Sequence, residues 1–281
     1  MKLRIIHKTE YEFSSKVFFE PHFFRFKPKT TPHLQLETFN LDVSPVPVGI
    51  SENTDAENNL INLCWFEGMH EKMLITSEIK VNSQEYNPFN FILYPGDYLN
   101  LPFQYSKDLW EVLSPAMILE PINASLLEFG QKILAGSNAN TVEFLTNLTK
   151  QIHSNFTLIN REFGSPLEAN ETFRLKTGSC RDLAWMQIMV LRHMGFASRF
   201  VSGYYFLKIQ DANFELHAWV EVFLPGAGWI GFDPSHGLFA GNTHIPIASS
   251  SKSENTMPVS GIIRGSATSK METNLYIENV V

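Results

Sequence analysis

The residues best suited to chemistry lie in the stretch LKTGSCRDLAWMQIMVLRHMGF, residues 175–196. Cys180 directly precedes a long apolar run that is typical of a buried helix. Ser179 and Asp182 have the S-x-x-D spacing of a capping box, so Cys180 is predicted to be the first helical residue. There its sulfur meets unpaired backbone N–H groups and the positive end of the helix dipole, which together stabilise a thiolate. The plainer alternative is a small residue that merely fits the turn.

A nucleophilic thiol needs a base, and His217 is the candidate. It begins the predicted strand HAWVEVFL, in which successive side chains point to opposite faces. One face is aliphatic, whereas the face of His217 is more polar and aromatic and carries His217, Trp219, Glu221 and Phe223.

An aspartate that could orient this imidazole follows in the second strand of the predicted hairpin, GWIGFDP. If Phe223 pairs with Trp229, Asp233 lies opposite Trp219 and diagonal to His217. Diagonal neighbours are roughly 7–8 Å apart at the backbone, within reach of two side chains. A register one residue tighter puts the carboxylate on the wrong face. If Asp233 orients His217, we therefore expect the wider loop, or an equivalent bulge.

Cys180, His217 and Asp233 thus match the roles of nucleophile, base and orienting group. Taken singly, a strand histidine is more often structural, and an aspartate before a proline is more often a turn residue. Glu221 is a competing partner for His217, but it lies two residues along the same strand and projects parallel to the imidazole. The combination favours a catalytic triad over three unrelated structural residues.

The elements that must position these residues divide the chain into two predicted domains. Residues 1–110 alternate as several short strands, which predicts a β-sandwich or curved sheet, and end in a proline-rich extended connector that begins at Pro88. The apolar parity shifts between Leu36 and Phe39, which indicates a bulge or a break. Residues 111–281 contain helical patterns, with Asn140 a possible N-cap, then the strands RFVSGYYFLKI, ELHAWVEVFL and GWIGFDP, and finally short C-terminal strands assigned to the same domain.

Composition excludes several classes of function. The 281-residue chain carries a net charge of −7, which argues against nucleic acid as the main partner. Neither the N-terminus nor any later run has a signal-peptide or membrane-spanning pattern, so we expect a cytoplasmic protein with no membrane partner. The two cysteines, Cys64 and Cys180, form no C-x-x-C pair, and we expect no disulfide, no metal and no cofactor. Cys64 is expected to be a core residue of a strand, and nothing in the sequence sets an oligomeric state.

The same residues resemble a known family. LKTGSCRDLAWMQIMVLRHMGFASRFVSGY and ELHAWVEVFLPGAGWIGFDPSHG, with their G-x-C-R-D and H-A-W-x-E motifs, are similar to the core of bacterial transglutaminase-like proteins, which belong to the papain-like superfamily. The β-region up to about Val81 resembles the N-terminal domain that accompanies this core, and GNTHIPIASSS and PVSGIIRG resemble the family's tail. The resemblance implies an α+β fold, in which a helix bearing the cysteine packs on an antiparallel sheet bearing the histidine and the aspartate.

The resemblance also implies a Cys180–His217–Asp233 triad and acyl transfer from an amide in a peptide or protein substrate. Hydrolysis and transfer to an amine both remain open, as does a binding protein that keeps the core without turnover. We found no acidic loop that would imply the calcium dependence of animal transglutaminases. Tyr204 and Trp219 are candidate walls of a substrate site, with ordinary aromatic packing as the alternative.

Overall fold

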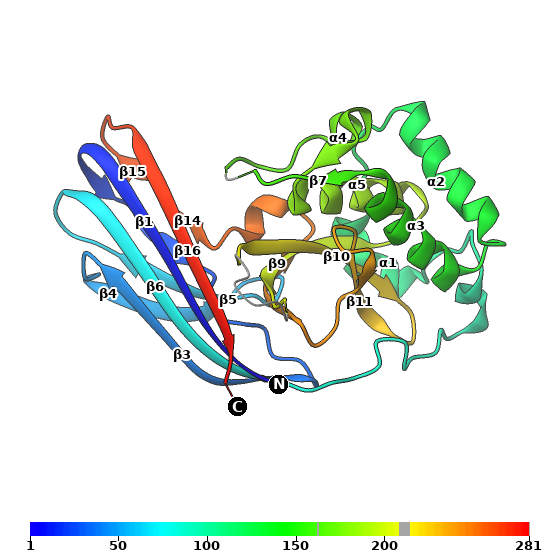
Figure 1. Ribbon diagram of the computed structural model, residues 1–281, viewed down its shortest axis with the longest axis horizontal. Coiled ribbons are helices and arrows are strands. Elements are labelled where there is room, and N and C mark those ends of the chain that lie inside the picture. Colours follow the sequence, from blue (N-terminus) through cyan, green and yellow to red (C-terminus); the bar gives the residue numbers. More distant parts are fainter. Residues whose placement is uncertain (162, 208–213, 281) are drawn as a thin grey trace.

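The computed structural model describes residues 1–161, 163–207 and 214–280. It is an α+β protein in which two β-sheets at one side pack against a core of helices and a third sheet (Figure 1). The end of the strand predicted over RFVSGYYFLKI, residues 208–209, lies outside the described residues.

The N-terminal half forms the predicted β-sandwich. One sheet has the order β15-β1-β6-β3 with β16 also paired to β1, and the second has the order β14-β2-β5-β4. The first sheet contains β1 (Lys2–Phe19), β3 (Leu34–Ser44), β6 (His70–Ser83), β15 (Ile263–Arg264) and β16 (Ser269–Asn279). The second contains β2 (His22–Phe24), β4 (Gly49–Thr54), β5 (Leu60–Trp65) and β14 (Val259–Ser260).

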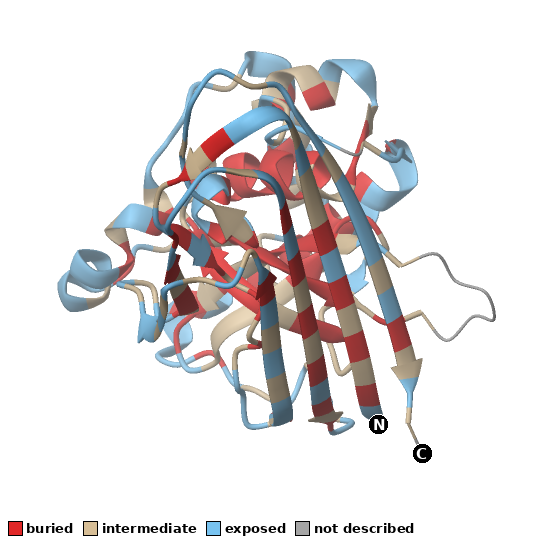
Figure 2. Ribbon diagram, turned by 90° about the vertical axis from the view of Figure 1, so that its left-hand side faces the viewer, coloured by how far each residue is buried: buried red, intermediate tan, exposed pale blue. Residues whose placement is uncertain are grey.

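Alternation along these strands explains the sandwich, because the buried residues of one parity form a shared core (Figure 2). Phe19, Phe24 and Ile75 are among the buried members, and Cys64 is buried with them, as predicted for a strand core residue. The expected irregularity in β3 is also confirmed, since its pairing with β6 shifts between Leu36 and Thr38.

The sequence suggested that the C-terminal strands belong to the core domain, but the structure places the last strand in the N-terminal sheet. β16 runs antiparallel along β1 from Leu3↔Asn279 to Phe13↔Ser269, so the last strand of the chain completes the N-terminal sheet (Figure 1). Ile277 lies opposite Ile5 and is buried with it. Strand pairing between the two chain ends is a long-range choice that no local pattern in β16 specifies.

The connector is less extended than its prolines suggested. A proline-free stretch between Pro102 and Pro115 forms α1 (Lys107–Leu113), with Ser106 as its N-cap. The 3₁₀ turns η1 (Gly96–Leu99) and η2 (Ser114–Met117) lie on either side of α1. The domain boundary near residue 110 stays a prediction.

The core contains a five-stranded sheet of order β12-β11-β10-β9-β13. Its strands are β9 (Ser198–Tyr205), β10 (Leu216–Leu224), β11 (Gly228–Asp233), β12 (Leu238–Phe239) and β13 (His244–Ser250). The helices are α2 (Ala124–Gly136), α3 (Thr141–Asn155), α4 (Ala169–Leu175) and α5 (Cys180–His193), with the short parallel pair β7 (Thr157–Leu158) and β8 (Thr177–Gly178) and the turn η3 (Ser253–Thr256). Of the helices described, none combines the length and the apolar character needed to span a bilayer.

Helix α5 is the centre of this core. Residues 182–192 are all buried, and Val190 and Leu191 share a cluster with Val220 and Val222 of β10 (Figure 2). The helix ends at His193, and Gly195, two residues later, has a φ of +89°, a left-handed conformation that glycine adopts without strain. A second cluster joins the core to the sandwich, so β9 and β13 pack against β1 and β6.

The packing of β16 between the sandwich and the core can be tested at Ile277, whose side chain is buried. We expect Ile277→Ala to lower the free energy of unfolding by about 2–4 kcal/mol, because it leaves a cavity between the sandwich and the core. Thr273→Ser, an exposed change on the same strand, should stay within about 0.5 kcal/mol. Urea denaturation measures both. Equal, small losses would mean that β16 does not pack on this core in solution.

Candidate active site

Cys180 begins α5, and its surroundings form the predicted capping box. The backbone N–H and the hydroxyl of Ser179 each donate to Asp182 Oδ2 at 2.7 Å. Cys180 itself is partly exposed and lines a cleft. The thiol is therefore accessible while its helix is held rigidly in the core.

Asp182 does more than cap the helix, because it also anchors the loop beside Cys180. Its other oxygen, Oδ1, accepts hydrogen bonds from the Arg161 guanidinium and, at 2.8 Å, from the backbone N–H of Leu167. Burial alone would raise the pKa of Asp182, but Arg161 and these N–H and hydroxyl donors outweigh it and lower the pKa. Arg181 holds the same loop from the other side by donating to the carbonyls of Arg161 and, at 3.0 Å, Phe163.

His217 and Asp233 meet through the predicted register. β10 and β11 pair Phe223 with Trp229, and the ladder ends at Val220↔Phe232, which places Asp233 diagonal to His217. The loop itself is three residues long, because Leu224 also pairs with Gly228. His217 Nε2 lies 2.8 Å from Asp233 Oδ2. Of the two ring nitrogens, Nδ1 is then the one left for Cys180.

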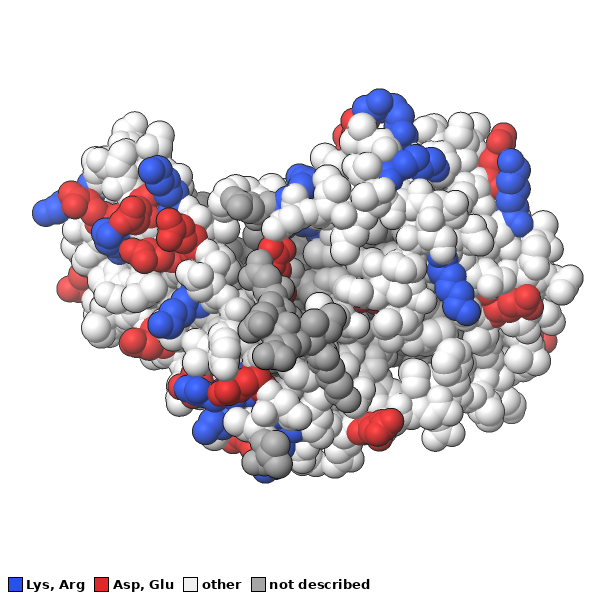
Figure 3. All heavy atoms as spheres, in the orientation of Figure 1, with Lys and Arg blue, Asp and Glu red and all other residues white. Residues whose placement is uncertain are grey.

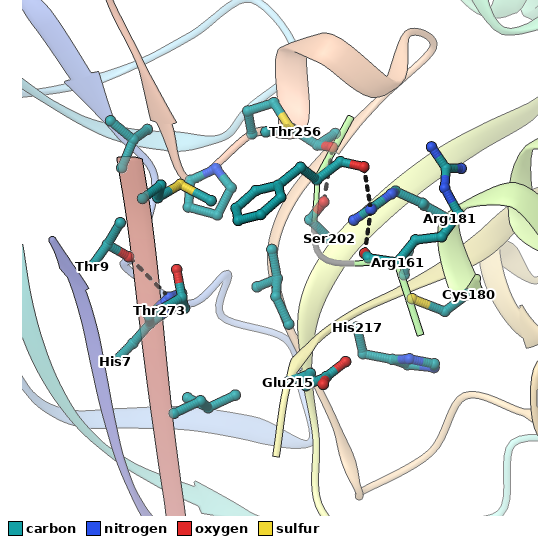
Figure 4. Close-up of a pocket in the computed structure, with 18 of the residues that line it drawn as sticks. His7, Thr9, Arg161, Cys180, Arg181, Ser202, Glu215, His217, Thr256 and Thr273 are labelled. Carbon is teal, nitrogen blue, oxygen red and sulfur yellow. Dashed lines mark hydrogen bonds between the residues drawn. The ribbon is translucent and has the colours of Figure 1, made fainter. Parts of the chain in front are cut away.

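The structure brings Cys180 beside His217 (Figure 4). Burial lowers the pKa of His217, but the charge and hydrogen bond of Asp233, with the hydrogen bond and charge of Cys180, outweigh it and raise the pKa to about 10. Burial likewise opposes ionisation of Asp233, yet His217, His236 and His244 hold its pKa well below the usual value. The pair is therefore an imidazolium–carboxylate pair at neutral pH.

Two residues that the sequence left without a role also contact Asp233. His236 Nδ1 lies 2.8 Å and His244 Nε2 lies 3.1 Å from the same Oδ2. Tyr205 packs against the rings of both, with centroids 4.4 and 4.6 Å away. The sequence offered one indication that these histidines belong to the site: both follow Asp233 within eleven residues.

His217, Asp233 and His236 offer ligand atoms within 4.8 Å of one another, a spacing that could hold a metal ion. Nε2 of His217 and Nδ1 of His236 each lie at hydrogen-bond distance from the Asp233 carboxylate. Binding a metal at these nitrogens would require them to lose the protons that form those hydrogen bonds. A hydrogen-bonded cluster accounts for the arrangement without an ion.

The prediction that Tyr204 lines the site is wrong. Tyr204 is fully buried, belongs to the cluster between the sandwich and the core, and has its hydroxyl 3.1 Å from His7 Nδ1. The reason is parity: His217 pairs with Gly203, so Tyr204 points to the opposite face and its neighbour Tyr205 takes the position near His217.

Trp219 lies on the face of His217, as expected, but it is 1% exposed and does not line the cleft. Its ring stacks near His217 at 6.2 Å between centroids. A Cβ at Gly203 would fall 2.6 Å from this indole, and one at Gly231 would fall 3.4 Å from it, so glycines on both neighbouring strands make room for the ring. Trp219 therefore packs beside the imidazole of His217 and does not form a wall of the substrate cleft.

Cys180 and His217 lie at one end of a cleft of about 1060 Å³. The sandwich forms its other wall, with Thr9 and Thr273 facing the thiol end across the cleft (Figure 4). Its charged lining residues are mixed in sign: Lys8, Arg161, Arg181, Glu215, Glu254 and Glu272. The molecular surface is hollowed between the sandwich and the helical part, and acidic and basic side chains are interspersed on the face shown (Figure 3).

Two families match the chain. Residues 3–82 match the bacterial transglutaminase-like N-terminal region, and residues 128–234 match the transglutaminase-like superfamily. The second match spans the proposed nucleophile, base and orienting aspartate. The first match covers the sandwich strands from β1 to β6, apart from their end residues.

The chain is similar to three proteins of interest. It is 24% identical over 285 residues to an uncharacterized protein of Mycobacterium tuberculosis, covering 93% of this chain and 87% of that one. Over 71 residues it is 34% identical to a protein-glutamine gamma-glutamyltransferase of Pseudomonas aeruginosa, covering 23% of this chain and 11% of that one. The solved structure of a Cytophaga hutchinsonii protein described as a "putative cysteine protease" has a TM-score of 0.72 at 20% identity, covering 100% of this chain and 92% of that one.

The anchoring role of Asp182 can be tested by Asp182→Asn, which should lower the free energy of unfolding at pH 7 by about 3 kcal/mol, because it leaves Arg161 without its buried partner. Since the pKa of Asp182 is lowered in the folded protein, its contribution is full above pH ~3.8 and is lost as pH falls through the folded value. The difference between variant and wild type in urea denaturation should therefore shrink in acid. Glu171→Gln, in an exposed pair with Arg174, is the matched control and should change little. A loss that does not depend on pH would contradict a role for the charge.

Proposed function

Because this chain belongs to the transglutaminase-like superfamily and carries the bacterial N-terminal region of that family, we propose that it is a cysteine-dependent acyl-transfer enzyme that hydrolyses peptide or amide bonds. The observation that carries the proposal is the cluster of Cys180, His217 and Asp233 at the end of an open cleft. A solvent-accessible thiol beside an imidazolium is the arrangement that nucleophilic catalysis requires.

In the first half of the proposed reaction, the Cys180 thiolate attacks the amide carbonyl carbon. The backbone N–H of Cys180, in the first turn of α5, is placed to donate to the developing oxyanion. The C–N bond then breaks, His217 gives its Nδ1 proton to the departing nitrogen, and the amine or ammonia leaves. The acyl group remains on the sulfur as a thioester.

In the second half, neutral His217 removes a proton from water, and the resulting hydroxide attacks the thioester carbonyl. The C–S bond breaks, the carboxylic acid leaves, and the proton held by His217 restores the thiolate–imidazolium pair. Asp233 keeps the ring in place throughout, because its bond to Nε2 fixes which nitrogen faces the sulfur.

The dimensions of the cleft favour a polypeptide substrate over a small amide. Its volume lies at the upper limit of the roughly 300–1,000 Å³ range of small-molecule pockets, and its lining mixes apolar, charged and neutral polar residues. Residues 271–276 of β16 line the far wall. Within the described residues, the outer edge of β16 pairs at a single bridge, Leu275↔Phe214, so backbone groups along it are available to an extended chain.

Transfer of the acyl group to an amine is the second candidate. It is favoured by the similarity of a short part of the chain to a protein-glutamine gamma-glutamyltransferase. The chemistry to the thioester is the same in both cases, and the acceptor in the second half decides between them.

Alkylation of Cys180 by iodoacetamide across pH tests the proposed nucleophile–base pair. We expect Cys180 to react rapidly well below pH ~8.5, where an ordinary thiol is protonated, because the imidazolium beside it stabilises the thiolate. In His217→Ala the rate at neutral pH should fall by at least about tenfold. Cys64 is an internal control, since burial raises its pKa to about 11. The rates are read by mass spectrometry of the labelled peptides.

Equal pH profiles for Cys180 in the wild type and in His217→Ala would overturn the proposed nucleophile–base pair. The remaining interpretation would then be a binding protein that has kept the core. His193→Ala serves as a matched control, because His193 lies at the opposite end of α5 and should leave the profile unchanged.

Product analysis distinguishes hydrolysis from transfer to an amine. With a glutamine-containing peptide library and a protein substrate such as casein, we expect new peptide termini or carboxylates whose formation requires Cys180 and no added amine. Incorporation of a fluorescent primary amine, with ammonia release that depends on that amine, would instead establish the transferase. Cys180→Ser is the control for both measurements, since a hydroxyl at this site lacks the thiolate.

A further inference from the structure

A single oxygen of Asp233 is shared by three imidazoles that come from three different segments. His217 belongs to β10, His236 to the turn after β11 and His244 to β13, and their nitrogens lie 2.8, 2.8 and 3.1 Å from Oδ2. The second oxygen, Oδ1, accepts the backbone N–H of Ser235 at 2.9 Å. An aspartate that orients a catalytic histidine needs only one imidazole partner, so the contacts of His236 and His244 must serve another purpose.

The proton positions on His244 follow from its contacts. Its Nδ1 accepts the backbone N–H of Gly241 at 3.2 Å, so the ring proton is on Nε2, which donates to Asp233. The side chain is buried, and burial lowers its pKa, so it is a neutral donor with a fixed tautomer. His236 donates from Nδ1, because an ionised carboxylate has no proton to offer.

We propose that His236 and His244 are positioning residues of the active site, which hold Asp233 ionised and turn its Oδ2 toward His217 so that Nδ1 of His217 faces Cys180. The inference rests on the proposed function. A carboxylate that accepts several hydrogen bonds favours its charged form and loses rotational freedom. Because the three imidazoles come from different segments and the Ser235 N–H binds the other oxygen, the carboxylate has one arrangement that satisfies them all.

The titratable groups around this cluster come from several elements. His153 of α3 has its Nδ1 2.9 Å from the carbonyl oxygen of Ser235, in the turn that carries His236. Cys180 approaches from α5 and Tyr205 from β9, beside His236 and His244 themselves. Glu221, on the strand of His217, is instead bound to Arg199 of β9 at 2.7 Å. Asp233 is therefore the carboxylate that contacts His217 among the described residues, and its protonation controls the imidazolium.

The test uses matched pairs of variants, because each histidine has an amide substitute that keeps its donor. Asn places an N–H near the Nδ1 position and Gln places one near the Nε2 position, whereas Leu keeps bulk and removes the donor. The variants are His236→Asn with His236→Leu, and His244→Gln with His244→Leu. The readout is the pH profile of Cys180 alkylation in the full chain.

The acid limb is the part of the profile in which the alkylation rate rises with pH. We expect it to move toward higher pH by about one unit in each Leu variant. Loss of one hydrogen-bond donor lets Asp233 be protonated more easily, and a protonated Asp233 no longer stabilises the imidazolium of His217. The Asn and Gln variants should return the limb to the wild-type position. A role in packing alone would change the melting temperature in both members of a pair and leave the acid limb unmoved.

Unmoved limbs in folded Leu variants would overturn the inference. If His244→Leu fails to fold, the His236 pair decides, since the side chain of His236 is 26% exposed and tolerates substitution. His217→Ala separates the two proposals: a profile that depends on His217 but not on His236 or His244 removes only the positioning role. A profile that does not depend on His217 removes the proposed catalytic pair itself.

Discussion

The ionised carboxylate of Asp182, buried at the first turn of α5, is the interaction on which the rest of the structure depends. A buried charge must find partners, and this one takes them from Ser179, Leu167 and Arg161. The start of the helix and the loop beside the cleft are therefore fixed to the same group. The position of the Cys180 sulfur follows from this anchor, because Cys180 lies between two residues of the capping box.

Asp233 applies the same principle on the sheet side of the site. It too is fully buried, and its partners are imidazoles instead of a guanidinium. A guanidinium remains charged at any physiological pH, whereas an imidazole can accept and release a proton. One buried carboxylate thus provides a rigid anchor for the nucleophile, and the other supports a group that exchanges protons.

Much of the site could be predicted from the sequence because its signals are local. Residue types at fixed spacing predicted the capping box at Ser179, and side-chain parity predicted the register of Phe223 with Trp229 and the irregularity after Leu36. The assignment of Tyr204 failed by one residue, which in a strand reverses the face. His236 and His244 were missed because they converge on Asp233 from a turn and from a strand on the far side of β9.

The sequence by itself determined which residues can react and the local elements that carry them, since capping and strand alternation act over a few residues. Only the tertiary structure decided what faces the thiol. The pairing of β16 with β1 joins the two ends of the chain and brings the sandwich across from Cys180 as the second wall of the cleft. That wall depends on burial of Leu3, Ile5 and Ile277 against the core, a gain in apolar contact that no single strand specifies.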